Sequence, residues 1–156
     1  MPRPAPSVPP DSAFALRLTA ADSDIDELGH VSNVVYVRWL QDVAHAHSRA
    51  CGWDIPEYRD IGAVFVVRRH EIDYIRPVYA RDAVLARTWV AGFSGASCER
   101  RTRFVRESDG LELARGVTTW VFVSSDAGRP KRIPDALAEA FGAKRWARKE
   151  GPGGGP

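Results

Sequence analysis

The sequence contains only two cysteines, Cys51 and Cys98, and neither lies in a C-x-x-C pair or in a cluster with metal-ligand spacing. This spacing predicts neither a disulfide framework nor a metal site. No apolar run approaches the roughly 20 residues of a membrane-spanning helix, and the proline-rich start lacks the apolar stretch of a secretory signal. We therefore expect a cytoplasmic protein with reduced cysteines, no membrane contact and no bound metal.

An excess of one charge sign is also lacking, since 22 lysines and arginines accompany 20 aspartates and glutamates and leave a formal net charge of +2. This balance does not suggest nucleic acid as a partner, although a local basic patch remains possible. With 156 residues, 44% of them hydrophobic, the chain has the size of one domain with a substantial core. We expect that domain over residues 13–147, between disordered tails at 1–12, rich in proline, and 148–156, rich in glycine.

In the first half of the chain, a strand pattern is followed by a helix pattern. Phe14, Leu16 and Leu18 alternate with other residues, which is the period of a half-buried strand. From residue 33 the spacing is that of an amphipathic helix. Its apolar face is formed by Tyr36, Leu40, Val43 and Ala50. The polar residues 32–33 can cap the start of this long helix, and Gly52 suits its end.

Four further strands are predicted in the second half of the chain. They cover residues 63–75, 82–92, 97–107 and 111–124, and their breaks contain Pro77, Gly95 and the Asp109-Gly110 pair. We expect a short linker with Pro56 before them, an antiparallel meander of the four strands, and a short terminal helix that starts at Pro134. The predicted fold is α+β, with an antiparallel sheet of about five strands wrapped around the long helix, which alone is large enough to cover it.

The segment that could carry chemistry is residues 22–33, where three aspartates, a glycine and a histidine directly precede the long helix. A helix N-terminus offers unpaired backbone N–H groups and the positive end of the dipole, which can bind a polarised carbonyl oxygen. A neighbouring carboxylate can attack the carbonyl carbon or activate water. Acidic loops that merely cap helices have the same composition, so residue types alone leave both interpretations open.

Two motifs in this sequence resemble those of the 4-hydroxybenzoyl-CoA thioesterase family. The first is Asp24-x-Asp26-x-x-Gly29-His30-Val31-x-Asn33-x-x-Tyr36, and the second is Glu71-Ile-Asp-Tyr-Ile-Arg-Pro77 followed by Asp82. The resemblance implies a hotdog fold and an acyl-CoA thioesterase that hydrolyses a fatty or aromatic acyl-CoA without a further cofactor. It also implies a homodimer or a dimer of dimers. The sequence departs from the family pattern at Ser32, where a second asparagine is usual, and this leaves the acyl specificity open.

The resemblance also implies particular site residues. Asp26 corresponds to the family's catalytic carboxylate, acting as nucleophile or as general base. A backbone N–H at or next to Asn33 is the implied oxyanion donor; the Asn33 side chain either caps the helix or orients water. His30 is a further catalytic candidate, which either donates to the substrate or acts as a base, or else only holds the loop. The candidate substrate-binding residues are Gly29, Tyr36, Arg68, Arg69, Ser94, Ser97 and Arg101; the resemblance implies the turn with Ser94 and Ser97, whereas the arginines are candidates because of their charge.

Among these residues, Tyr36 faces the same side of the helix as Leu40 and Val43, which favours a place in the core over one in the site. Arg68, Arg69 and Arg101 could bind the phosphates of CoA through charge-assisted hydrogen bonds. Arg100 and Arg103 add to the basic character of the sheet. Arginines on a solvent-exposed face of the sheet would give the same pattern as a CoA-binding site, so both interpretations stay open.

Two other functions remain open at this point. A hotdog protein that binds acyl-CoA or an acyl carrier protein without turnover would keep the fold, and the presence of Asp26 argues against it. A nucleic-acid-binding sheet could use the arginines with Trp89 or Trp120, but no recognition motif accompanies them.

Overall fold

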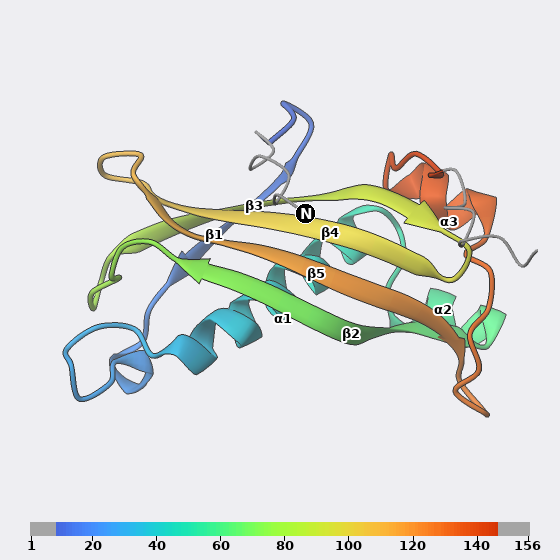
Figure 1. Ribbon diagram of the computed structural model, residues 1–156, viewed down its shortest axis with the longest axis horizontal. Coiled ribbons are helices and arrows are strands. Elements are labelled where there is room, and N and C mark those ends of the chain that lie inside the picture. Colours follow the sequence, from blue (N-terminus) through green and yellow to red (C-terminus); the bar gives the residue numbers. More distant parts are fainter. Residues whose placement is uncertain (1–8, 147–156) are drawn as a thin grey trace, which may run out of the picture.

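An antiparallel sheet of five strands curves around one long helix (Figure 1). The computed structural model describes residues 9–146. The elements are β1 (Phe14–Thr19), the short 3-10 helix η1 (Asp22–Asp24), α1 (Asn33–Ala50), α2 (Ile55–Ile61), β2 (Ala63–Tyr74), β3 (Ala83–Ser94), β4 (Ser97–Arg106), β5 (Glu112–Ser124) and α3 (Asp135–Ala140). The prediction of about five strands around a long helix is confirmed.

Most of the two predicted tails lies outside the described residues, which exclude 1–8 and 147–156. Residues 9–12 lie next to β1. The carbonyl of Pro10 accepts hydrogen bonds from the backbone of Ala13 and from the side chain of Arg87 on β3.

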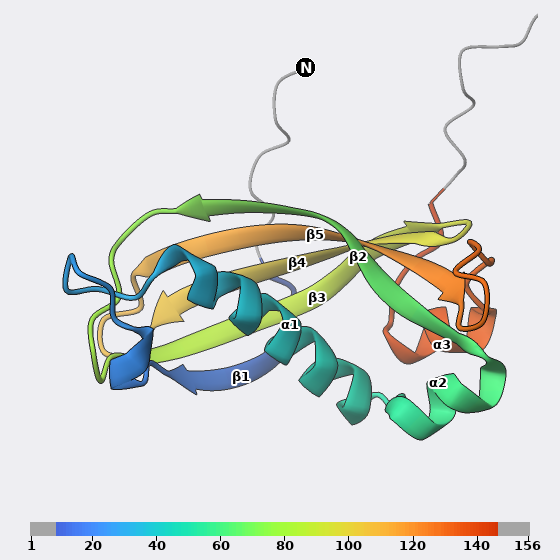
Figure 2. The same cartoon turned by 90° about the horizontal axis from the view of Figure 1, so that it is seen from below.

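The strands follow the order β1-β3-β4-β5-β2, and every neighbouring pair is antiparallel. β3, β4 and β5 form a meander as predicted, and Gly95 and Gly110 adopt left-handed φ angles of +58° and +70° in its two turns. The prediction that β2 continues this meander beside β3 was wrong, because β2 pairs with β5 instead. The segment between β2 and β3 contains Pro77 and is too long for a tight hairpin, so it crosses the end of the sheet. β1 and β2 therefore form the two edges (Figure 2).

The main core lies between α1 and the sheet. Its helical part consists of Val35, Tyr36, Trp39, Leu40 and Val43, all of them buried. The sheet contributes Phe104 and Leu113 among others. At Gly116 on β5 the helix comes so near the sheet that a Cβ atom would lie 2.9 Å from Cδ2 of Leu40. The absence of a side chain at Gly116 thus sets how deeply α1 lies in the curve of the sheet.

The segment between α1 and β2 is a helix, α2, and not the linker that Pro56 suggested. Asp54 is its N-cap: its carboxylate accepts a hydrogen bond from Ile55 N, and Asp54 N donates to the Glu57 carboxylate. This capping box was readable in the sequence, and a proline is compatible with the first turn of a helix. The terminal helix α3 occurs where it was expected, with Pro134 at its N-cap.

The contact at Gly116 predicts a specific loss of stability. A valine at this position would overlap with Leu40, so we expect Gly116→Val to lower the free energy of unfolding by about 1–3 kcal/mol in urea denaturation. In a Leu40→Ala background the same substitution should cost less, because the overlapping methyl groups are gone. Equal costs in both backgrounds would contradict the proposed role of this contact.

Candidate functional site

The two motifs found in the sequence meet at the N-terminal end of α1. Val31 N donates a hydrogen bond of 2.7 Å to Val78 O, in the segment that follows the second motif. The hydroxyl of Tyr74, within the second motif, donates to the carbonyl of Asn33 at 3.3 Å. The segment between β2 and β3 therefore supports the loop that precedes α1.

Asp26 lies in a tight loop whose two ends are joined by a bridge between Ile25 and Val31. Asp26 N donates to the carbonyl of His30 at 2.9 Å, and Gly29, at a φ of +85°, allows the chain to reverse between them. One carboxylate oxygen of Asp26, Oδ1, accepts a hydrogen bond from Leu28 N at 2.9 Å. The other, Oδ2, lies 3.8 Å from Nδ1 of His30, and both side chains are about 30% exposed. The loop therefore holds Oδ1 through the Leu28 N–H, whereas the backbone of the loop gives Oδ2 no hydrogen bond.

Asp24 is bonded differently, although it stands only two positions earlier. Its side chain is 7% exposed, its Oδ1 accepts from Nη2 of Arg38 at 2.7 Å and its Oδ2 accepts from Ala21 N at 2.9 Å. The hydrogen bond from Arg38, followed by that from Ala21, lowers the pKa of Asp24. Asp24 thus links η1 to α1, and both of its oxygens are already engaged.

The start of α1 offers backbone donors next to this loop. The first N–H groups of a helix have no partner within the helix, and Ser32 occupies the N-cap position without making a side-chain capping bond. The surface around them is apolar, with Leu28 78% and Val34 72% exposed. An oxygen atom bound here would meet helix N–H groups, while an attached apolar group would cover Leu28 and Val34.

Tyr36 and the remaining predicted contacts do not join this loop within one chain. Tyr36 is 3% exposed and packs edge-to-face against Trp39, Tyr74 and Phe104, so it belongs to the core. Burial raises its pKa to about 12.

The other predicted substrate-binding residues are spread over the sheet. Arg68 and Arg69 lie in the middle of β2 at a bulge, where Arg69 pairs with Glu71. Ser94 and Ser97 flank the β3–β4 turn. This turn lies at the opposite end of the sheet from the loop that precedes α1 (Figure 1). Arg101 pairs with Glu99 on the outer side of β4. One chain alone does not gather these residues into a site.

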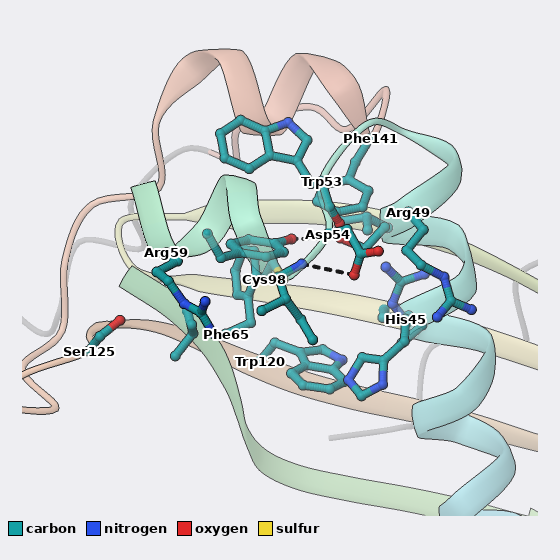
Figure 3. A pocket seen from close by; sticks show the side chains of 17 residues that line it. His45, Arg49, Trp53, Asp54, Arg59, Phe65, Cys98, Trp120, Ser125 and Phe141 are labelled. Atoms are coloured by element: carbon teal, nitrogen blue, oxygen red, sulfur yellow. Dashed lines mark hydrogen bonds between the residues drawn. The ribbon is translucent and has the colours of Figure 1, made fainter. Parts of the chain in front are cut away.

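A cavity of about 480 Å³ at the C-terminal end of α1 was missed by the sequence reasoning. Aromatic side chains line much of it, among them Trp53 just before α2, Phe65 on β2, Trp120 on β5 and Phe141 in the C-terminal segment (Figure 3). Ser48 is hydrogen-bonded to the hydroxyl of Tyr58 at its wall. Such a volume falls in the range of small-molecule pockets, about 300–1,000 Å³.

Arg100 also lines this cavity and is 5% exposed. Its Nη1 donates to Nδ1 of His47 at 2.9 Å and to the hydroxyl of Thr88 at 3.1 Å. His47 is stacked on Phe14, and its pKa is lowered to about 4, by burial first and by the positive charge of Arg100 second. The sequence did contain the signal for this buried arginine, because Arg100 alternates in phase with Thr102 and Phe104, which are also buried.

The described part of the chain gives no sign of a metal centre or a membrane span. No group of three or more histidine, cysteine, aspartate or glutamate side chains within residues 9–146 could hold a metal ion. None of the helices in that range is both long and apolar enough to cross a membrane.

Comparison with known families identifies the class of this protein. The sequence profile of the thioesterase-like superfamily matches residues 21–141, and the chain belongs to that superfamily. This membership confirms the family resemblance that the two motifs indicate. Among curated proteins, the chain is similar to the chloroplastic acyl-acyl carrier protein thioesterase ATL3 of Arabidopsis thaliana, at 21% identity over 128 residues. The match covers 81% of this chain and 66% of the length of that relative.

Solved structures confirm the hotdog fold. A 1,4-dihydroxy-2-naphthoyl-CoA thioesterase from Synechocystis superposes with a TM-score of 0.76 at 15% identity, covering 83% of this chain and 95% of the other. A protein from Staphylococcus aureus, solved in complex with CoA, superposes with a TM-score of 0.77 at 13% identity, covering 83% and 82%. At these identities the likeness shows the fold and leaves the substrate open.

The buried His47 predicts a loss of stability in mild acid. Between pH 6.5 and about 4 the unfolded chain binds a proton at His47 that the folded chain does not, so the free energy of unfolding falls as the pH falls. We expect a loss of up to about 3 kcal/mol at this residue. His47→Asn keeps a neutral acceptor for Arg100, and denaturation curves across this pH range should show a shallower decline for it. Parallel declines for both proteins would contradict the assignment.

Proposed function

We propose that this protein hydrolyses acyl-CoA thioesters, with Asp26 as its catalytic carboxylate. The observation that carries the proposal is the Asp26 carboxylate, about 30% exposed and held by the loop backbone through Oδ1, beside the uncapped start of α1 in a member of the thioesterase-like superfamily. Asp24 is a poorer candidate because Arg38 and Ala21 occupy its oxygens. Asp22 is exposed on η1.

Two chemical routes fit this arrangement. In the first, the Asp26 carboxylate adds to the thioester carbonyl carbon, the C–S bond breaks, the thiolate leaves and takes up a proton, and water hydrolyses the mixed anhydride. In the second, Asp26 takes a proton from a water molecule that attacks the same carbon, the C–S bond breaks, and the leaving thiolate takes up that proton. In both routes negative charge develops on the carbonyl oxygen, and the N–H groups at or next to Asn33 would stabilise it.

The surrounding residues have positioning roles in this proposal. The Leu28 N–H holds Oδ1 of Asp26, and this leaves Oδ2 as the reacting atom. His30 holds the loop through its carbonyl, which accepts from Asp26 N. Gly29 provides the reversal at positive φ. Arg68, Arg69 and Arg101 remain the proposed contacts for the CoA phosphates, and CoA is preferred over an acyl carrier protein because a protein of the same fold was solved with CoA.

We further infer that the active unit is a cytoplasmic homodimer, or a dimer of dimers, built through the edge strand β2. Its outer edge leaves a row of backbone groups unpaired by this sheet, and Val66 and Tyr74 on this strand are exposed, as is Ile75 just beyond its end. Antiparallel pairing of β2 with its copy would rotate the partner by 180° and reverse the direction of its α1. The Asp26 loop of one subunit would then lie at the same end of the assembly as the cavity of the other.

Asp26→Asn tests the catalytic assignment, because it keeps the shape of the side chain and removes its charge. We expect the release of free thiol from acyl-CoA to fall by about a hundredfold to ten-thousandfold. The panel should contain short, long and aromatic acyl groups together with an acyl carrier protein thioester. Asp22→Asn is the matched control, since it removes an exposed carboxylate from the same segment.

Turnover that survives Asp26→Asn would overturn the mechanism. If the wild-type protein binds acyl-CoA but releases no thiol across the whole panel, it is a binding protein and the proposed function is wrong.

The oxyanion donor is tested by Asn33→Ala, which removes the side chain and leaves the backbone N–H in place. We expect kcat to fall by less than about tenfold, a smaller loss than Asp26→Asn produces. Steady-state kinetics of both variants with the same substrate gives the ranking. The opposite ranking would show that the Asn33 side chain takes part in the chemistry.

A further inference from the structure

The cavity at the C-terminal end of α1 contains a buried cation without an anionic partner. No carboxylate within residues 9–146 forms an ion pair with Arg100, whose side-chain partners are the neutral His47 ring, the Thr88 hydroxyl and the ring of Phe141, with Cζ of Arg100 5.7 Å from the ring centroid. Both bonds use Nη1, so Nε and Nη2 have no acceptor in the described part of the chain. Burial lowers the pKa of Arg100 to about 10, which leaves the guanidinium charged at neutral pH. A buried charge of this kind is costly unless something pairs with it.

A second donor in the same cavity also lacks a partner. Trp120 is 8% exposed, and its Nε1 is buried without an acceptor in residues 9–146. Its ring lies beside that of His45, with centroids 6.4 Å apart (Figure 3). Buried donors are nearly always satisfied in folded proteins, so the unpartnered Trp120 Nε1, in the same cavity as a guanidinium that lacks an anion, indicates that a ligand supplies an acceptor.

The charge around the cavity favours an anion. The lining includes the basic side chains of Arg49, Arg59 and His45, all of them exposed. Asp54 is the acidic residue of the lining. Asp54 is engaged as the N-cap of α2, where it accepts from Ile55 N. The remaining walls are mainly aromatic and aliphatic, which suits a hydrocarbon chain. An acyl group with an apolar middle and a negatively charged end would satisfy both parts of the cavity.

We propose that Arg100 binds a carboxylate at the far end of the acyl group, so that the preferred substrates are CoA thioesters of dicarboxylic acids. This inference rests on the proposed thioesterase function, and it adds the substrate class. The apolar walls bind the methylene chain, while Arg100 and Trp120 Nε1 donate to the carboxylate. Such a site discriminates strongly against an acyl group that ends in a methyl, because the buried donors are then left unpaired.

The test compares matched pairs of substrates that differ only at the far end: hexanoyl-CoA with hexanedioyl-CoA, octanoyl-CoA with octanedioyl-CoA, and decanoyl-CoA with decanedioyl-CoA. For the pair that fits best, we expect kcat/KM to favour the dicarboxylic thioester by about tenfold to a hundredfold. Arg100→Met should abolish this preference and retain hydrolysis of the monocarboxylic thioester, while Arg100→Lys should keep part of it. Because the ratio is taken on one preparation, an unfolded fraction does not alter it.

Arg87→Met is the matched control, since Arg87 lies on the outer side of β3 and bonds to the Pro10 carbonyl. It should leave the preference unchanged. A wild-type protein without a preference, or a preference that survives Arg100→Met, would overturn the inference while leaving the thioesterase function intact.

A binding measurement separates failure of the proposed thioesterase function from failure of the inference about Arg100. If no thioester is hydrolysed, calorimetric titration of the Asp26→Asn protein with octanedioyl-CoA and octanoyl-CoA still tests Arg100. Tighter binding of the dicarboxylic thioester, lost in the Asp26→Asn, Arg100→Met double variant, supports the inference. Equal affinities contradict it.

Discussion

The packing of α1 into the curve of the sheet determines where chemistry can occur in this protein. Gly116 lets the helix approach the sheet, and the apolar side of α1 anchors it there along its length. A helix of 18 residues is about 27 Å long, so its two ends are held at fixed and distant places. The N-terminal end carries the Asp26 loop and the C-terminal end carries the cavity. A short acyl group cannot reach both within one chain.

This separation gives the proposed dimer a physical role. α1 runs antiparallel to β2, since Asn33 lies near the end of β2 at Tyr74 and α2 leads directly into its start. A twofold axis through β2 would bring the helix start of one subunit toward the cavity end of the other. The exposed Val34 on α1 and Ile55 on α2 would then lie near the contact. The scattered positions of the predicted substrate-binding residues become understandable if a site draws on two chains.

The sequence predicted the parts of the fold that local patterns determine. Period-two alternation located β1, and the helical spacing located α1 at the residues where the structure has it. The place of β2 beside β5 could not be read, because strand pairing depends on contacts between residues far apart in the chain. α2 was overlooked although Asp54 and Glu57 form a recognisable capping box, since Pro56 was interpreted as a break.

The candidate site was predictable to a similar degree. The motif located Asp26, but only the structure revealed that Arg38 and Ala21 occupy the oxygens of Asp24. Arg100 was grouped with its basic neighbours, although its alternation with Thr102 and Phe104 assigns it to the inner face. Burying a guanidinium with neutral partners lowers the free energy of unfolding, and an apolar residue at this position would make the fold more stable. Ligand binding explains its position better than stability does.

The most direct test of this account is the structure of Asp26→Asn with octanedioyl-CoA bound, which traps the substrate before hydrolysis. The account predicts the thioester carbonyl within hydrogen-bonding distance of the N–H groups at the start of α1, with its carbon next to residue 26. The acyl chain should enter the cavity of the partner subunit and end at Arg100. A thioester bound away from residue 26, or an acyl chain outside that cavity, would contradict it.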